Sequence, residues 1–78
     1  MTDESLEEWI VGRLSEALIV PVKDINPVVP FARLGVDSMV MIGFATELES
    51  LLGRPIDPQV LFEHRSPRAL ALYLNAGS

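Results

Sequence analysis

An aspartate and a serine, Asp37 and Ser38, stand side by side near the middle of this 78-residue sequence. Gly35 precedes them and permits a tight or left-handed turn, and an apolar run follows them. Asp37 is a favoured N-cap residue, which leaves Ser38 at the first helical position. The first N–H groups of a helix lack intrahelical partners and lie at the positive end of its dipole. A phosphate carried on the Ser38 hydroxyl would therefore be stabilised there.

Catalysis by Ser38 is the competing chemistry, and the sequence argues against it. A serine nucleophile requires a base and a group that orients that base. The one histidine, His64, precedes the last predicted helix, where a lone histidine is more often a packing or surface residue. Glu7 and Glu8 are adjacent, so they do not face each other on a helix. We predict that the chain is not an enzyme, and no ligand spacing indicates a metal site.

Composition excludes several classes of function. Six Lys and Arg residues against eleven Asp and Glu give a net charge of −5, and there is no cysteine. Nucleic-acid binding, including reading by a helix-turn-helix, depends on a basic surface that this chain lacks. No apolar run approaches the ~18 residues of a membrane span, and the acidic N-terminus is unlike a signal peptide. We expect a single cytoplasmic domain over residues 1–78, with no nucleic-acid or membrane partner.

The apolar pattern predicts an all-α fold, a small four-helix bundle of three long helices and one short helix. The first helix has apolar residues at helical spacing and ends before Pro21: Leu6, Trp9, Ile10, Leu14, Ala17 and Leu18. The second runs from Ser38 to about Leu52, with Gly53 as its stop. Asp57-Pro58 opens the short third helix over residues 59–62, and Ser66-Pro67 opens the last, which ends at Gly77.

The first connection, residues 20–37, is unusually long for a compact domain. Its three prolines, Pro21, Pro27 and Pro30, exclude a helix interior and a central strand. Such a loop has to be held by its own side chains. We expect six apolar residues to pack it against the core: Val22, Ile25, Val28, Val29, Phe31 and Leu34.

The second helix begins with seven consecutive non-polar residues, Met39 to Ala45, which surround it on every side. We assign one stripe to the core: Met41, Phe44, Ala45, Leu48 and Leu52. The opposite stripe consists of Met39, Ile42, Gly43 and Thr46. It is either covered by the third helix or the long loop, or exposed as a partner surface. Gly43 favours contact with a partner, because a glycine inside a helix costs about 1 kcal/mol relative to alanine.

The stretch Leu34-Gly35-Val36-Asp37-Ser38-Met39 resembles the attachment site of acyl carrier proteins, although that family usually has Leu where Met39 stands. The segments Leu61-Phe62-Glu63-His64 and Ser66 to Leu74 are similar to the closing part of carrier domains in modular polyketide synthases. The resemblance implies that Ser38 carries covalent 4′-phosphopantetheine, added from coenzyme A by a phosphopantetheinyl transferase that recognises Asp37. Acyl groups would ride as thioesters on this arm.

The resemblance also implies partners and a setting. Acyltransferase, ketosynthase or acyl- and aminoacyl-loading enzymes would meet Met39, Ile42, Gly43 and Thr46 in transient complexes with a monomeric carrier. Polyketide or hybrid biosynthesis of a natural product such as an antibiotic is the expected setting. A start at Met1 favours a free-standing protein, but a module excised from a synthase would look the same.

Two other functions stay open at this point. One is a peptidyl or aminoacyl carrier of a nonribosomal pathway, although such carriers usually have Gly-Gly before the residue that precedes the serine. The other is a helical protein-interaction module without an arm. In a carrier of the polyketide or the peptidyl type, three arginines in a weakly basic stretch are expected either to contact acidic residues of a partner or to be merely solvated: Arg54, Arg65 and Arg68.

Overall fold

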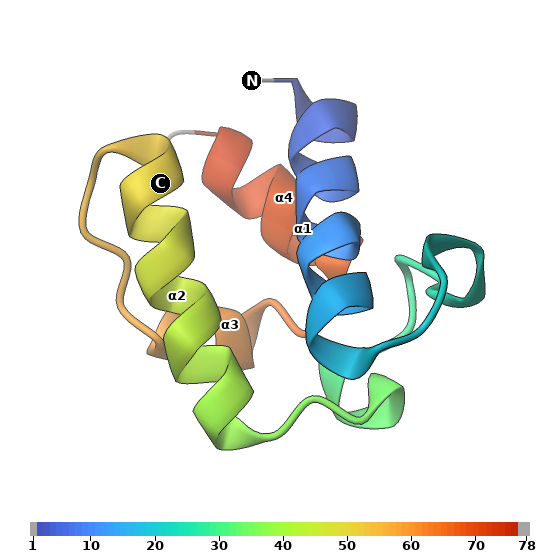
Figure 1. Cartoon of the computed structure of the whole chain (residues 1–78). Helices are drawn as coiled ribbons and strands as arrows, with labels where there is room; N and C mark the ends of the chain where they lie inside the picture. The colour runs from blue at the N-terminus through green and yellow to red at the C-terminus, as the bar shows by residue number, and fades with distance from the viewer. Residues whose placement is uncertain (1, 77–78) are drawn as a thin grey trace.

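The computed structural model describes residues 2–76, and they form four α-helices without a strand. The elements in chain order are α1 (Asp3–Leu18), η1 (Val22–Asp24), η2 (Phe31–Leu34), α2 (Ser38–Leu52), α3 (Gln59–Glu63) and α4 (Pro67–Asn75). Figure 1 shows α1 packed beside α4, with α2 on the other side of the bundle and the short α3 near it. The predicted fold class is confirmed, and two short 3₁₀ turns in the long first loop are additions to it.

Local side chains determine where the helices begin. The Asp37 carboxylate caps α2 by accepting from the Val40 N–H at 2.9 Å, as predicted. The Ser66 hydroxyl caps α4 by accepting from the Ala69 N–H at 3.2 Å, also as predicted. The cap of α1 was not predicted: Thr2 and Ser5 form a reciprocal capping box.

The helix ends follow backbone conformation. Gly53 ends α2 in the left-handed region at φ 67°, as predicted. Helix α1 stops at Leu18, ahead of Pro21, because Ile19 itself turns left-handed at φ 56°. Helix α3 starts at Gln59 and reaches Glu63, one residue beyond the prediction. The predicted stop at Gly77 lies outside the described residues.

The core is wholly apolar among the described residues, and it includes the buried Phe44 of α2. Trp9 stacks on the Phe44 ring at a centroid distance of 5.8 Å, and Phe31 meets it edge-on at 6.5 Å. These aromatic contacts join α1, the first loop and α2. The predicted core stripe of α2 is buried, except that Leu52 is only half-buried. On α1, Val11 is buried and Ala17 is exposed, contrary to the predicted spacing.

The long first loop is held partly by backbone bonds that the sequence did not reveal. Ile25 and Phe31 are buried as predicted, but Val22 and Val28 are 55% and 52% exposed, so their predicted role is wrong. Instead, the carbonyl of Pro27 accepts from the Arg68 N–H at 3.0 Å. The Phe31 N–H donates to the carbonyl of Arg65 at 2.7 Å. These two bonds tie the loop to the segment between α3 and α4.

Candidate functional site

Ser38 is the first residue of α2, and its side chain is exposed. Its hydroxyl has no hydrogen-bond partner within residues 2–76. The neighbouring Asp37 carboxylate is held by Val40, and the Asp37 carbonyl accepts from the Met41 N–H at 3.0 Å. The cap is therefore supplied by Asp37, as predicted, and the Ser38 hydroxyl is available for modification.

The turn that leads into Ser38 depends on Gly35. Gly35 adopts φ 89° and ψ 18°, in the left-handed region that side chains disfavour. The Val36 N–H then donates back to the carbonyl of Phe31 at 3.1 Å, which closes the turn after η2. This turn directs the chain from η2 into the first residue of α2.

A groove of about 630 Å³ opens beside Ser38. It lies between η2, the start of α2 and the end of α3, and we call it the α2–α3 groove. Its lining residues are Pro30, Phe31, Ala32, Val36, Asp37, Ser38, Met41, Leu61, Phe62 and Arg65. The walls are largely apolar, with Asp37 and Arg65 as the charged residues among those that line it. The sequence did not predict this groove, because no local pattern shows that Phe62 and Arg65 line the same groove as Ser38.

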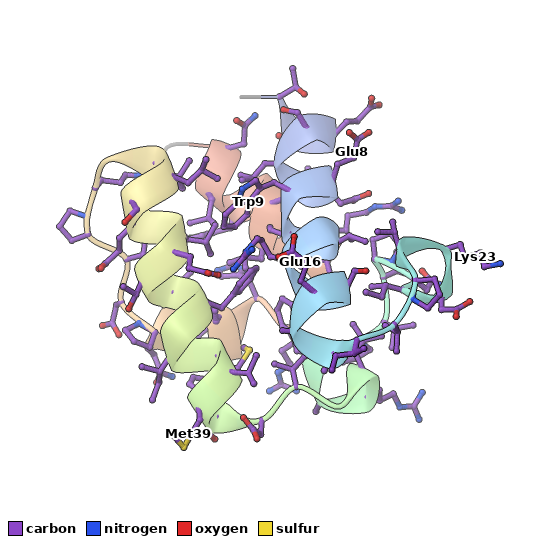
Figure 2. All side chains as sticks on the ribbon, viewed as in Figure 1. Glu8, Trp9, Glu16, Lys23 and Met39 are labelled. Carbon is purple, nitrogen blue, oxygen red and sulfur yellow. The ribbon has the colours of Figure 1, made fainter. Side chains whose placement is uncertain are left out.

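The second stripe of α2 is on the surface, and we call it the outer stripe: Met39, Ile42, Gly43 and Thr46. Met39 is 81% exposed and Ile42 is 54% exposed. Figure 2 shows Met39 pointing away from the bundle at the start of α2. Gly43 has open space where a Cβ would lie, so no contact within the described chain requires a glycine there. Neither the third helix nor the loop covers this stripe.

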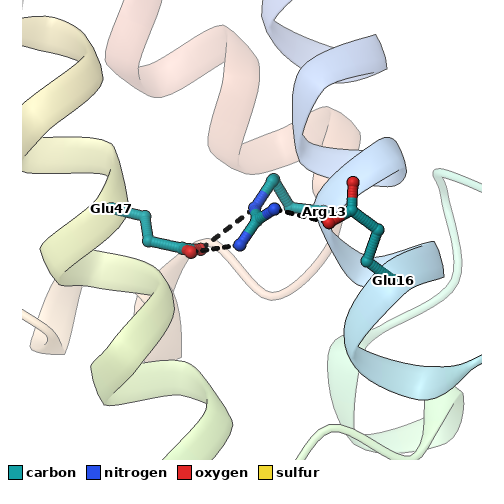
Figure 3. A network of polar contacts seen from close by, with 3 residues as sticks. All are labelled: Arg13, Glu16 and Glu47. Atoms are coloured by element: carbon teal, nitrogen blue, oxygen red, sulfur yellow. Dashed lines mark hydrogen bonds and ion pairs between the residues drawn. The ribbon is translucent and has the colours of Figure 1, made fainter.

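The carboxylates of α2 are engaged inside the chain. Arg13 of α1 donates two N–H groups to Glu47, and its Nε lies 3.2 Å from Glu47 Oε2 (Figure 3). The Nη1 of Arg13 also lies 2.6 Å from Glu16 Oε2. Hydrogen bonding and charge from Glu47 raise the pKa of Arg13 above its ordinary value. The other carboxylate, Glu49, accepts from the Ile56 N–H at 2.8 Å. The outer stripe contains no charged residue, and both carboxylates of α2 have partners inside the chain.

The three arginines expected at a partner interface differ in their surroundings. Arg54 donates to the carbonyl of Leu74 at 2.6 Å. Arg68 pairs with Glu7 at 2.8 Å, and this contact raises the Arg68 pKa above its ordinary value. Arg65 is exposed and makes no ion pair within residues 2–76. The structure thus brings only Arg65 to the groove beside Ser38.

His64 is occupied elsewhere. Its ring stacks on Tyr73 with a centroid distance of 3.9 Å and an interplanar angle of 23°. It is not among the residues that line the α2–α3 groove. Residues 2–76 also contain no cluster of three or more His, Cys, Asp or Glu side chains arranged as metal ligands. No helix in the same range has both the length and the apolar character to cross a membrane.

Residues 8–74 match the protein family described as "Phosphopantetheine attachment site". The chain belongs to this family. It is 32% identical over 69 residues to one subunit of the phenolphthiocerol/phthiocerol polyketide synthase of Mycobacterium tuberculosis, a match that covers 88% of this chain and 4% of that protein. Against polyketide synthase PksL of Bacillus subtilis the identity is 28% over 67 residues, covering 86% of this chain and 2% of PksL. The chain thus spans a small fraction of these curated relatives.

Two solved structures of carrier proteins have the same fold. One is a free-standing peptidyl carrier protein from Acinetobacter baumannii, with a TM-score of 0.92, 25% identity, and 96% of this chain and 94% of that chain covered. The other is BlmI, a type-II acyl carrier protein from Streptomyces verticillus involved in bleomycin biosynthesis. Its TM-score is 0.84 at 26% identity, with 96% of this chain and 88% of that chain covered. The protein is therefore a carrier of the phosphopantetheine attachment family, related to polyketide and peptidyl carriers.

This family carries 4′-phosphopantetheine as a covalent group, and the residues around Ser38 fit such a group. The hydroxyl is exposed, has no hydrogen-bond partner in the described part of the chain, and lies at the positive end of a 15-residue helix. The α2–α3 groove beside it has apolar walls and a cation in Arg65. Carriers of this kind are themselves non-catalytic, and they interact with phosphopantetheinyl transferases and synthase enzymes.

Proposed function

We propose that residues 1–78 form a single carrier domain that holds acyl, or aminoacyl-derived, intermediates on a 4′-phosphopantetheine arm at Ser38. The observation that carries the proposal is the exposed, unbonded Ser38 hydroxyl at the first position of α2, next to a cap that Asp37 already supplies. The domain presents these intermediates to enzymes of polyketide or hybrid natural-product biosynthesis. Relatedness to polyketide synthase carriers supports this setting.

The residues of the site have separate tasks in this proposal. The Ser38 hydroxyl supplies one oxygen of the phosphodiester that attaches the arm. The terminal thiol of the arm supplies the sulfur of the thioester that holds the cargo. Asp37 fixes the start of α2 and marks the serine for the transferase. The tether then raises the effective concentration of the cargo at each docked enzyme, without the carrier itself doing chemistry.

Partner enzymes dock on the outer stripe of α2 in this proposal. The transferase comes first, followed by an acyltransferase, a ketosynthase or a loading enzyme. Met39 and Ile42 supply exposed apolar area, and the small residues Gly43 and Thr46 leave room for a partner to approach the helix closely. Such a small patch suits brief encounters better than a permanent interface. Of the three arginines, we retain only Arg65 as a contact for acidic residues of a partner enzyme, because Arg54 and Arg68 already have partners in the chain.

Intact-mass analysis tests the attachment directly. The protein is incubated with coenzyme A and a phosphopantetheinyl transferase of broad specificity. We expect one added phosphopantetheine per chain on the wild type, none on Ser38→Ala, and full addition on the matched control Ser50→Ala, whose serine is exposed later on α2. Absence of an adduct on the wild type, or an adduct on Ser38→Ala, would overturn the proposal.

A peptidyl or aminoacyl carrier is the second candidate, favoured by the TM-score of 0.92 to a peptidyl carrier protein. The two carrier roles differ in cargo and share the attachment chemistry. The mass of the thioester released from protein purified from its native host separates them. An α-aminoacyl group supports the peptidyl role, whereas a malonyl-derived or ketide group supports the polyketide role. Persistently unmodified Ser38 in that host would favour an interaction module instead.

A further inference from the structure

We propose that Arg65 is the counter-ion of the phosphodiester on Ser38, and that it draws the arm into the α2–α3 groove. This inference rests on the proposed attachment at Ser38. It gives Arg65 a role within the modified chain, in addition to the contact with acids of a partner enzyme proposed above. The ligand chemistry is a phosphodiester monoanion with an apolar and amide-rich tail.

The first argument is placement. Ser38 and Arg65 line the same groove, although they lie on opposite sides of α3 in the sequence. The backbone beneath Arg65 is fixed, because its carbonyl accepts from the Phe31 N–H at 2.7 Å and the next residue, Ser66, caps α4. The exposed side chain can therefore move over the groove while its base stays in place.

The second argument is charge. Asp37 already lines the groove, and its carboxylate accepts from the Val40 N–H. A phosphodiester on Ser38 adds a second negative charge close to the first, and like charges at short range repel. Arg65 is the one cation among the residues that line this groove. A planar guanidinium can donate two parallel N–H bonds to phosphate oxygens, which a lysine ammonium cannot match.

The third argument is availability. Arg13 and Arg68 are in ion pairs, and Arg54 donates to a backbone carbonyl. Arg65 has no such partner within the described residues, so binding the phosphodiester breaks no existing ion pair. Arg33 on η2 is also exposed and makes no ion pair there, but it does not line the groove. Arg33 therefore offers a matched control of the same charge.

The groove also suits the rest of the arm. Among its lining residues Phe62 is exposed, and Phe31, Met41 and Leu61 are buried. The pantoyl part of the arm carries two methyl groups, which gain by leaving water for such walls. The phosphodiester end would thus lie at Arg65 and the methyl groups against the apolar side chains.

The test follows the protein before and after modification by NMR. Uniformly ¹⁵N-labelled wild type, Arg65→Gln and Arg33→Gln are converted with coenzyme A and a broad transferase, and mass analysis establishes complete conversion. In the wild type we expect the Arg65 Nε–Hε resonance and the Phe31 and Leu61 amides to shift on modification. The ³¹P resonance of the phosphodiester should differ between wild type and Arg65→Gln, and should be unchanged in Arg33→Gln.

The outcomes separate this inference from the proposed function. If the wild type takes no adduct, both are overturned. If all three proteins are modified but the Arg65 Nε–Hε resonance stays in place, only the role of Arg65 is overturned. An equal ³¹P change in both variants would also overturn it, because it would show a general effect of charge. The wild-type Arg65 resonance requires no substitution, so the test stands even if Arg65→Gln folds poorly.

Discussion

The two halves of the bundle use their polar side chains differently. Where α1 meets α4, Glu7 pairs with Arg68, and the Asn75 amide donates to Asp3 at 2.6 Å. Between α2 and α3 no side-chain hydrogen bond or ion pair is found in the described residues. That second half instead leaves the Ser38 hydroxyl and the Arg65 guanidinium without partners and exposes apolar side chains. Ser38 and Arg65 are therefore available to other molecules, whereas Glu47 and Glu49 of α2 bond within the chain.

The largest effects are expected from substitutions on the two faces of α2, one buried in the core and one exposed to other molecules. Phe44→Ala removes a buried ring from the core and should lower the free energy of unfolding by about 3–5 kcal/mol. Ile42→Glu places a charge on the exposed outer stripe and should leave that free energy nearly unchanged. It should reduce kcat/KM of the transferase roughly tenfold, equivalent to about 1.4 kcal/mol. Urea denaturation and steady-state kinetics check both, and reversed effects would show that the faces are misassigned.

Two serines at helix starts sharpen the contrast. Ser66 caps α4 with its hydroxyl, so Ser66→Ala should cost about 1 kcal/mol of stability and leave modification complete. Ser38→Ala should abolish modification and leave stability close to that of the wild type, because the Ser38 hydroxyl makes no hydrogen bond within residues 2–76. Chemical denaturation and intact-mass analysis measure the two quantities on the same samples. A marked loss of helicity in Ser38→Ala would instead make Ser38 structural.

The end of α1 offers a gain of stability. Ile19 is 90% exposed and adopts φ 56°, where a β-branched side chain is strained. Ile19→Gly relieves that strain but loosens the unfolded chain, so a net gain of about 0.5–1 kcal/mol is expected. Ile19→Ala is the control, since it removes the exposed side chain and keeps a Cβ. Thermal unfolding that ranks alanine equal to glycine would contradict the left-handed conformation.

The smallest effect is expected from the surface pair of Arg68 and Glu7. Arg68→Gln removes an exposed ion pair, and such pairs contribute little in water. Its stability should fall by less than that of Ser66→Ala, and the difference should shrink as added salt screens the charges. Denaturant titrations at low and high salt make the comparison. A loss that exceeds that of Ser66→Ala would mean that this pair holds α1 against α4.

The sequence predicted those features that depend on neighbouring residues. Asp37 and Ser66 were recognisable as caps because a cap bonds to an N–H only three residues away. The two stripes of α2 followed from helical periodicity, which held for all but the half-buried Leu52. The resemblance around Ser38 gave the family, which the match over residues 8–74 then established.

The predictions that were wrong or missing concern contacts between distant parts of the chain. Val22 and Val28 were expected to hold the first loop, but backbone bonds to Arg65 and Arg68 hold it instead. An apolar residue in a loop does not reveal whether the backbone is fixed by other means. The α2–α3 groove was missed for the same reason, because it exists only where α3 comes to rest beside η2.

Trp9 gives the molecule a built-in optical reporter. It is the only tryptophan in the chain, and its ring is half-buried and stacked on Phe44. Figure 2 shows it between α1 and α2. Its fluorescence should therefore sense any change in the separation of these two helices, so that unfolding can be followed without an attached dye.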